Sequence, residues 1–337
     1  MLLLLTLVSC GGSPPPSPPL ADLHLPGVTE IPGVSPLHRG PGTGEIEAVN
    51  AYLPSGGGAA RALVTIDAGL YDLALDGSRL HTLDISCGWP VTVSPDGTWA
   101  ACRDWHTVSF LPLTDAAPAA HPRVAPLPSD TVTNALDWLP DGHHLAVLHT
   151  TNACAIVIYA LDAASPSALT LVSTLTFPMF AQASLQHTCS LQGFAWSPDG
   201  AWLAVSSPHP AETDLISLRA WFPDLMRLTA VPSELTVTPA MLVRVDTTLA
   251  FAPLAWSAQN GRLTLTYANV ELHQGQVRQF DVATRTSTIL LSVPEGYIPA
   301  LSWTPDGKQM VFAQSPGRCG ECFKEPPSRL YVFTAER

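Results

Sequence analysis

The sequence predicts an all-β protein, a six-bladed β-propeller, from a repeated turn and the apolar strands around it. The turn reads Ser-Pro-Asp-Gly at 94–97 and 197–200, Leu-Pro-Asp-Gly at 139–142 and Thr-Pro-Asp-Gly at 304–307, and a degenerate copy ends at Gly261. The five turn glycines are 45, 58, 61 and 46 residues apart. A repeat of this length is typical of propellers and solenoids, and its Pro and Gly favour a type I β-turn.

Apolar residues alternate on both sides of the turns, which is the signal of a β-hairpin. In one repeat Leu-x-Trp at 136–138 precedes the turn and Leu-x-Val at 145–147 follows it, and two further strand-like runs lie at 155–159 and 169–173. Four strands form one propeller blade, and blades bury their faces by stacking around an axis. The residue between Leu and Trp is small in most repeats; Asp137 is an exception, for which we expect a local hydrogen bond.

The first and last units differ from this pattern. The first lacks the turn motif but has four strand-like runs at 46–53, 62–66, 71–75 and 80–85. The last has three strands, so we expect the segment 20–31 to supply its outer strand and to close the ring. A seventh blade would need strands that the sequence does not show.

Tryptophan recurs at one position of the repeat. Trp138, Trp196, Trp256 and Trp303 each stand just before the turn or its degenerate copy, and we expect them in the cores between blades. The run 221–223, Trp-Phe-Pro, is instead interpreted as an anchor at a blade edge or in a loop.

The Trp-Ser-Pro-Asp-Gly turn followed by an apolar strand resembles the PD40, or WD40-like, repeat of TolB-type propellers. The resemblance covers about residues 45–335. It implies a propeller fold, and such propellers occur as scaffolds, as binding proteins and as the non-catalytic halves of peptidases.

The charge of the chain excludes one class of partner. The net charge is −12, and Lys308 and Lys324 are the two lysines among 337 residues. Proteins that bind nucleic acids present a basic surface to the phosphates. We therefore expect no nucleic-acid partner.

The beginning of the chain suggests a lipid anchor. An apolar run at 1–8 leads into Leu7-Val8-Ser9-Cys10-Gly11, which is similar to the bacterial lipobox, whose cysteine is lipidated. The run is too short to span a bilayer. The resemblance implies a signal peptide at 1–10 and an extracytoplasmic protein anchored through Cys10 to the bacterial cell membrane or outer membrane.

The rest of the chain divides into two parts under this interpretation. The Pro-rich segment 11–43 would be a tether that includes the ring-closing strand, and residues 44–337 would form the propeller. A cytoplasmic protein with an apolar start is the alternative.

Six further cysteines all fall on one face of the predicted propeller, opposite the Pro-Asp-Gly turns. An even number of cysteines in an exported protein suggests disulfides, and their places on the blades suggest the pairs Cys87–Cys102, Cys154–Cys189 and Cys319–Cys322. Two alternatives stay open for Cys319-Gly-Glu-Cys322. A zinc site would need two more ligands, and a redox site would want a thioredoxin-like setting.

Motifs of catalysis are missing from the sequence. It contains no Gly-x-Ser-x-Gly, His-Glu-x-x-His, phosphate loop or dinucleotide fingerprint. We therefore expect no cofactor and no metal, and the enzyme interpretation is the less favoured one.

The candidate binding residues lie elsewhere in the repeat. Trp89, Trp105, His106 and His187 are predicted near the channel mouth on the face with the cysteines, and tryptophan is frequent at the energetic centres of interfaces. The sequence thus predicts a membrane-anchored binding or scaffold module for a protein, peptide or glycan partner. Two alternatives are an extracytoplasmic lyase or hydrolase with a site at the channel mouth, and a purely structural envelope or sensor subunit.

Overall fold

The computed structural model describes most of the chain between Leu23 and Ala335. The described residues are 23–32, 34, 46–67, 69–83, 88–104, 107–113, 123–127, 133–150, 154–161, 168–181, 189–191, 193–208, 221–245, 250–259, 262–271, 274–294, 296–315 and 328–335. Within them the structure is almost entirely β-strands, apart from single 3-10 turns at Pro178–Phe180 and Pro239–Met241. None of the helical turns in these ranges is long and apolar enough to cross a membrane.

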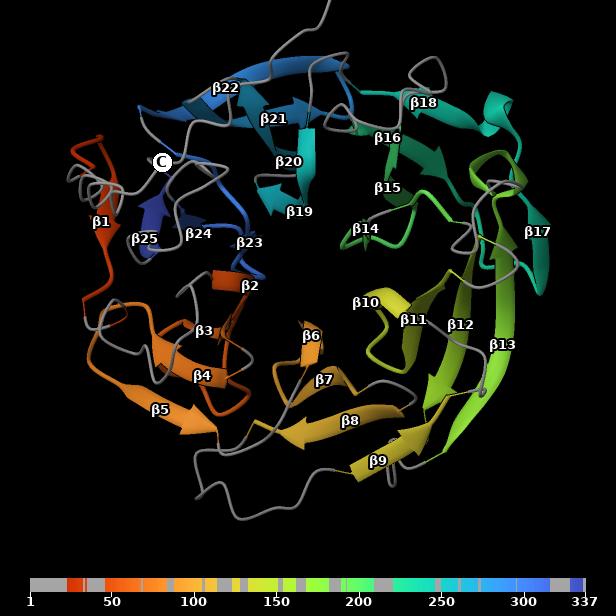
Figure 1. Cartoon of the computed structure of the whole chain (residues 1–337), viewed down its shortest axis with the longest axis horizontal. Helices are drawn as coiled ribbons and strands as arrows, with labels where there is room; N and C mark the ends of the chain where they lie inside the picture. Colours follow the sequence, from red (N-terminus) through yellow and green to blue (C-terminus); the bar gives the residue numbers. More distant parts are fainter. Residues whose placement is uncertain are drawn as a thin grey trace, which may run out of the picture.

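The strands form six blades around a common centre (Figure 1). Blade 1 contains β2 (Ile46–Tyr52), β3 (Arg61–Ile66), β4 (Gly69–Ala74) and β5 (Leu80–Leu83); blade 2 contains β6 (Gly88–Val93), β7 (Trp99–Asp104), β8 (Thr107–Pro112) and β9 (Arg123–Pro126); blade 3 contains β10 (Thr133–Trp138), β11 (His144–His149), β12 (Ala155–Leu161) and β13 (Leu169–Thr176). Blade 4 contains β14 (Gly193–Trp196), β15 (Trp202–Pro208), β16 (Trp221–Arg227) and β18 (Leu242–Arg244); blade 5 contains β19 (Ala250–Gln259), β20 (Arg262–Glu271), β21 (Gln274–Asp281) and β22 (Thr286–Val293); blade 6 contains β23 (Leu301–Trp303), β24 (Gln309–Gln314), β25 (Arg329–Thr334) and β1 (Val28–Glu30). The prediction of six blades is confirmed.

The ring is closed by the N-terminal strand, as the sequence predicts. β1 pairs antiparallel with β25, with Val28 opposite Phe333, and lies beside it in Figure 1. The N–H of Ile31 donates to the carbonyl of Leu330 at 2.9 Å, and Arg329 pairs with Glu30 at 3.5 Å. The outer strand of blade 6 therefore comes from the other end of the chain.

The Pro-Asp-Gly turns have the predicted geometry. In blade 2 the N–H of Gly97 donates to the Ser94 carbonyl at 2.9 Å, as in a type I turn, and Gly97 has a φ of +67°. The Asp96 carboxylate accepts the Ser94 hydroxyl at 2.6 Å and the Thr98 N–H at 3.0 Å. Asp199 and Asp306 make the equivalent bonds in blades 4 and 6. The aspartate is thus the internal brace of the turn.

Each pair of neighbouring blades encloses a hydrophobic core, and the repeated tryptophans lie in these cores as predicted. Trp138 is packed between blades 2 and 3, Trp196 between blades 3 and 4, Trp256 between blades 4 and 5, and Trp303 between blades 5 and 6. All four are at most 8% exposed. Further cores join blade 6 to blade 1 and blade 1 to blade 2. The apolar face of each blade is therefore buried by its neighbour.

Blade 4 departs from the sequence prediction in two ways. The run 221–223 is not a loop or edge anchor, because it begins β16, which pairs with β15 along its whole length. The chain then leaves blade 4 to form β17 (Glu234–Thr236), which pairs in parallel with β13 of blade 3, and returns as β18. The segment 228–245 thus ties the outer edges of blades 3 and 4 together.

Candidate functional site

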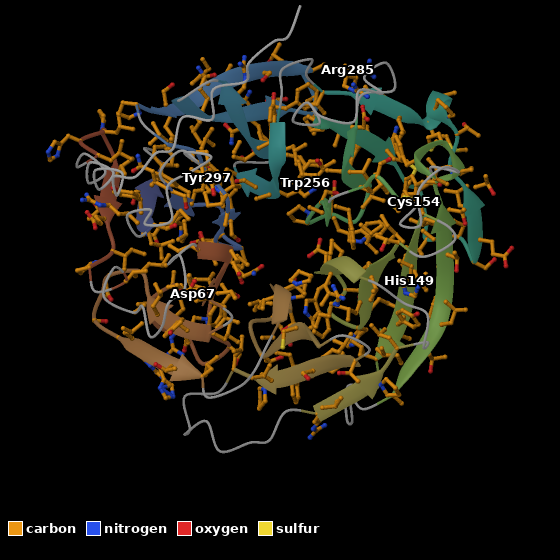
Figure 2. All side chains as sticks on the ribbon, in the orientation of Figure 1. Asp67, His149, Cys154, Trp256, Arg285 and Tyr297 are labelled. Atoms are coloured by element: carbon orange, nitrogen blue, oxygen red, sulfur yellow. A yellow bond between two sulfur atoms is a disulfide. The ribbon has the colours of Figure 1, made fainter. Side chains whose placement is uncertain are left out.

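A cavity lies at the centre of the ring, and the six innermost strands all line it. Its volume is about 190 Å³, and β2, β6, β10, β14, β19 and β23 each contribute to its wall. Figure 2 shows the side chains arranged around this centre, with Trp256 on its inner margin and Arg285 on the outer rim. The polar residues of the lining are Glu47, Asn50, Thr92 and Asp137, and no Lys, Arg or His is among the lining residues. The cavity therefore has an acidic character.

Three of these polar residues, Asn50, Thr92 and Asp137, belong to one repeated position, which we call the inner ring. It is the residue before the tryptophan position of each innermost strand, and its members are Asn50, Thr92, Asp137, Ala195, Ala255 and Ser302. Their side chains or carbonyls make hydrogen bonds from blade to blade. The Asn50 amide donates to the Val91 carbonyl at 2.7 Å, and the Ser302 hydroxyl accepts the Ala51 N–H at 3.0 Å.

Asp137 makes the most extensive of these contacts. Its Oδ2 accepts the Trp196 N–H of blade 4 at 2.9 Å, and its Oδ1 lies 3.4 Å from the Thr92 hydroxyl of blade 2. The expected local hydrogen bond is present to the Trp138 backbone, and the carboxylate in addition joins three consecutive blades. Among the described residues it has no cationic partner.

The surroundings of Asp137 change its acidity. Burial raises the pKa of the Asp137 carboxyl to about 7, and the hydrogen bonds from Trp196, Thr92 and Trp138 act in the opposite direction. The side chain keeps some exposure at the cavity. Near neutral pH this site is divided between a protonated and an ionised form.

Indole groups replace the inner-ring side chains at the two interfaces where the ring residue of the preceding blade is alanine. Trp256 Nε1 donates to the Ala195 carbonyl at 3.0 Å, and Trp303 Nε1 donates to the Thr266 hydroxyl at 2.8 Å. The Nε1 atoms of Trp138 and Trp196 have no hydrogen-bond partner in the described part of the chain. Those two tryptophans adjoin Asp137, so the carboxylate makes the polar contact at their interfaces.

The lining of the cavity begins on the face that carries the Cys154–Cys189 disulfide, which we call the cysteine-bearing face. Glu47, Pro90 and Gly193 stand at the starts of their strands, which follow the loops of that face, and Asn50 and Asp137 stand further along. Asn50 stands three positions after Glu47 on β2, which is about 10 Å at 3.3 Å per residue. A group entering from the cysteine-bearing face would pass Glu47 before it reached the inner ring.

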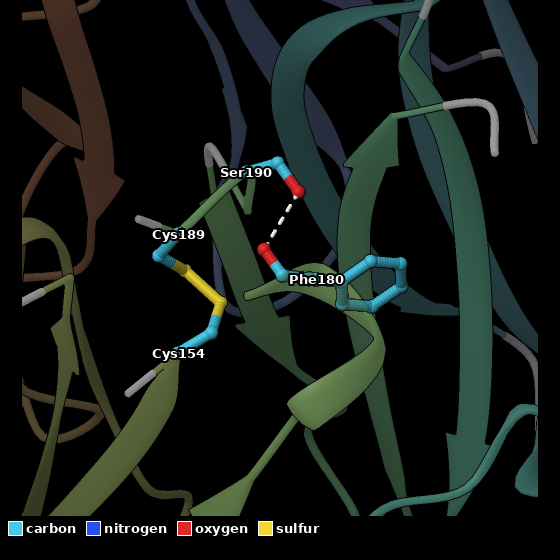
Figure 3. Close-up of a disulfide and its surroundings, with 4 residues drawn as sticks. All are labelled: Cys154, Phe180, Cys189 and Ser190. Atoms are coloured by element: carbon cyan, nitrogen blue, oxygen red, sulfur yellow. Dashed lines mark hydrogen bonds between the residues drawn. A yellow bond between two sulfur atoms is a disulfide. The ribbon is translucent and has the colours of Figure 1, made fainter. Parts of the chain in front are cut away.

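A disulfide fixes a loop on that same face. Cys154, just before β12, is bonded to Cys189, ahead of β14, with 4.7 Å between their Cα atoms (Figure 3). The predicted pairing of these two cysteines is present. Next to it the Ser190 hydroxyl donates to the Phe180 carbonyl at 3.0 Å. The bond ties blade 3 to the strand that opens blade 4.

The other predicted site residues are not tested by the structure. Residues that lie outside the described ranges are Cys10, Cys87, Trp105, His106, His187, Cys319 and Cys322. Trp89 belongs to β6, directly before the cavity-lining Pro90, but its side chain is outside the described part. Cys102 is disulfide-bonded, and its predicted partner Cys87 is among the residues not described.

Another titratable group with a shifted pKa lies in blade 3. His149 Nε2 is 3.2 Å from the Tyr159 hydroxyl, and the two rings stack with centroids 6.1 Å apart. Burial lowers the pKa of His149 to about 4 and raises that of Tyr159 to about 12. His149 is therefore neutral at pH 7. No group of three or more His, Cys, Asp or Glu suited to a metal occurs within the described ranges.

Sequence reasoning missed the cavity, although it noticed the residue that defines it. Asp137 interrupts a row of small residues at equivalent positions of the repeat. A charged residue at a place where other blades have Ala, Ser or Thr signals a contact particular to that blade. The sequence does not reveal that the residues at these equivalent positions contact the neighbouring blade around the channel.

Comparison with known proteins agrees with this architecture. No protein-family model matches the chain, and no curated protein sequence matches it. A structure assigned as TolB from Agrobacterium tumefaciens is 18% identical, with 87% of this chain and 91% of that chain covered and a TM-score of 0.50. The WD40 repeats of RRP9 and the structure of U3-55K are each 11% identical, with 92% and 98% of the chains covered and TM-scores of 0.53 and 0.52.

This chain is a six-bladed β-propeller. The similarity to a TolB structure and to WD40 structures confirms the fold that the repeat predicts. At 11–18% identity it shows the fold alone.

Proposed function

We propose that the protein is a membrane-anchored, extracytoplasmic scaffold that binds a protein, peptide or glycan partner on the cysteine-bearing face of its propeller. The observation that carries the proposal is the concentration of fixed features on this face. There the lining of the central cavity begins, and there the Cys154–Cys189 disulfide ties two blades. A surface held in one shape loses little conformational entropy when it binds.

The rigidity of the ring supports the same function. Hydrogen bonds cross from blade to blade at the inner ring, and the N-terminal strand completes blade 6. The lipobox-like sequence at Cys10 and the Pro-rich segment after it would hold this rigid ring away from a membrane.

Two variants test the anchor and the binding face separately. Cys10→Ala should move the protein from the membrane fraction to the soluble fraction, and retention on membranes would refute the anchor. For the face, partners captured by affinity from native envelopes should be lost from a Trp89→Ala/Trp105→Ala variant. A control variant, Leu171→Ala/Ile289→Ala, truncates side chains that are 62% and 53% exposed on outer strands, and it should keep the partners. Equal capture by both variants would remove the proposed face.

A further inference from the structure

The Asp137 carboxylate has hydrogen-bond donors around it but no positive charge. Its contacts are the Trp196 N–H, the Thr92 hydroxyl and the Trp138 backbone, and it makes no ion pair with any described residue. A carboxylate taken out of bulk water needs either a counter-charge or a proton. The cavity lining supplies no basic side chain, so a counter-charge for the ionised form would have to come from outside the ring.

Apolar residues form part of the cavity wall next to Asp137 and bury most of their side chains in the cores between blades. One residue of each innermost strand forms a layer directly before the inner ring, and these residues are Val49, Val91, Leu136, Phe194, Leu254 and Leu301. A cation that enters from the cysteine-bearing face must lie against this layer for several ångströms. An alkyl stem that carries a charged end fits such a wall better than a hydrated metal ion does.

The hydrogen bonds already made by Asp137 favour an ammonium over a guanidinium head group. Arginine binds a carboxylate best through two parallel bonds to both oxygens. Here Oδ2 already accepts the Trp196 N–H, and Oδ1 faces the Thr92 hydroxyl. An ammonium is a compact point charge that needs a single free lone pair.

We propose that the central cavity binds a primary alkylammonium group, with the alkyl stem against the apolar layer and the head group at Asp137. This inference rests on the proposed function, because a lysine side chain of the bound partner is the source that it identifies. The ammonium would enter from the cysteine-bearing face, past Glu47, where a second carboxylate attracts it.

Protons compete with the ammonium for the same carboxylate. The strands on either side of Asp137, β6 and β14, contain no titratable residue. On β11, the next strand outward in blade 3, His144 pairs with Asp141 and His149 contacts Tyr159. On β7, the next strand outward in blade 2, stands Arg103. Glu47 is the remaining carboxylate among the residues that line the cavity.

The Asp137 carboxyl is half-ionised near pH 7. Ammonium binding at pH 6 should therefore release close to one proton, and the apparent affinity for the ammonium should rise about tenfold from pH 6 to pH 8.

Calorimetric titration of the purified full chain with n-butylammonium chloride tests the proposal, with n-butanol as the uncharged probe of equal alkyl length. We expect a Kd on the order of 1 mM at pH 8, the tenfold weakening at pH 6, and no binding of butanol. Asp137→Asn should abolish binding, since the amide keeps an acceptor for the Trp196 N–H but loses the charge. Glu234→Gln removes an exposed carboxylate on β17 and should leave binding unchanged.

A blocked lysine, N-acetyl-lysine amide, distinguishes a polypeptide source from a free amine, with N-acetyl-norleucine amide as its neutral control. Binding of the blocked lysine, comparable to that of butylammonium, supports a partner's side chain. Binding of butylammonium alone would overturn the partner source, and equal binding to the wild type and Asp137→Asn would overturn the site. If the ammonium site is overturned, the partner could still be captured through the Trp89 and Trp105 face. Failure of the ammonium proposal is therefore distinguishable from failure of the proposed function.

Discussion

The Asp137 carboxylate in blade 3 accepts a hydrogen bond from the backbone N–H of Trp196 in blade 4, with 2.9 Å between Oδ2 and N. An innermost strand has no neighbour on its channel side, so this N–H would otherwise lack a protein partner. Ser302 does the same for the N–H of Ala51 between blades 6 and 1, at 3.0 Å. A side chain of one blade thus caps the open edge of the next.

The contribution of Asp137 to stability should depend on pH. Its pKa is about 7 in the folded protein, above the ordinary value of 3.8, so the folded state holds the proton more tightly. Stability from this group is complete below pH 4 and is lost as the pH rises through 7. Relative to Asp137→Asn, the unfolding free energy of the wild type should fall by up to about 1.4 kcal/mol per pH unit between pH 4 and 7. Urea denaturation across this range measures the difference, and parallel curves would contradict it.

His149 should produce the opposite pH dependence. Its pKa is lowered to about 4 from the ordinary value of 6.5, so its contribution is present above pH 6.5 and is lost as the pH falls towards 4. Relative to His149→Gln, the wild type should lose stability over that interval by up to about 1.4 kcal/mol per pH unit. Denaturation of both proteins at pH 4.5 and 7 tests this, and a histidine NMR titration with a midpoint near 6.5 would rule it out.

Loss of the Cys154–Cys189 disulfide should destabilise the propeller substantially. The bond joins residues 35 positions apart, and closing a loop of this length restricts the unfolded chain by about 3 to 4 kcal/mol. Cys154→Ala/Cys189→Ala should show that loss in chemical denaturation. Denaturation of the double variant with reductant measures separately the contribution of the disulfide that Cys102 makes. A loss below 1 kcal/mol would show that the bond does not constrain the fold.

Two turn glycines offer a matched pair. Gly97 and Gly142 have φ values of +67° and +69°, so alanine is strained at both. A Cβ on Gly97 would also lie 2.0 Å from the Leu53 carbonyl oxygen, whereas a Cβ on Gly142 meets nothing within 4 Å. Gly142→Ala should cost about 1 kcal/mol, and Gly97→Ala should cost at least 2 kcal/mol more. Equal melting temperatures for the two variants would refute this difference in packing.

The fold was predictable where a local rule repeats. Ser94, Pro95, Asp96 and Gly97 specify a turn through bonds among themselves, and Trp303 has a fixed relation to such a turn. The closing strand β1 was predictable as well, because blade 6 lacked an outer strand. These features depend on short segments or on counting strands.

The rest depended on contacts between blades that no local pattern reveals. The parallel pairing of Thr174 with Glu234 joins β13 of blade 3 to the segment that leaves blade 4. Nothing in the sequence of either strand indicates that it pairs with the other. The role of Asp137 likewise follows from the position of Trp196 on the next blade. Spacing along the chain gives the repeat, but the side chain that a neighbour presents has to be seen in the folded ring.

Site-specific photo-cross-linking in native envelopes shows whether a partner binds on the cysteine-bearing face. A benzophenone amino acid replaces Glu47 at the start of β2, or Ile289 on the outer strand of blade 5 as the control. We expect a cross-linked partner from position 47 that excess N-acetyl-lysine amide reduces, and none from position 289. A partner cross-linked from position 289 and not from position 47 would contradict this expectation.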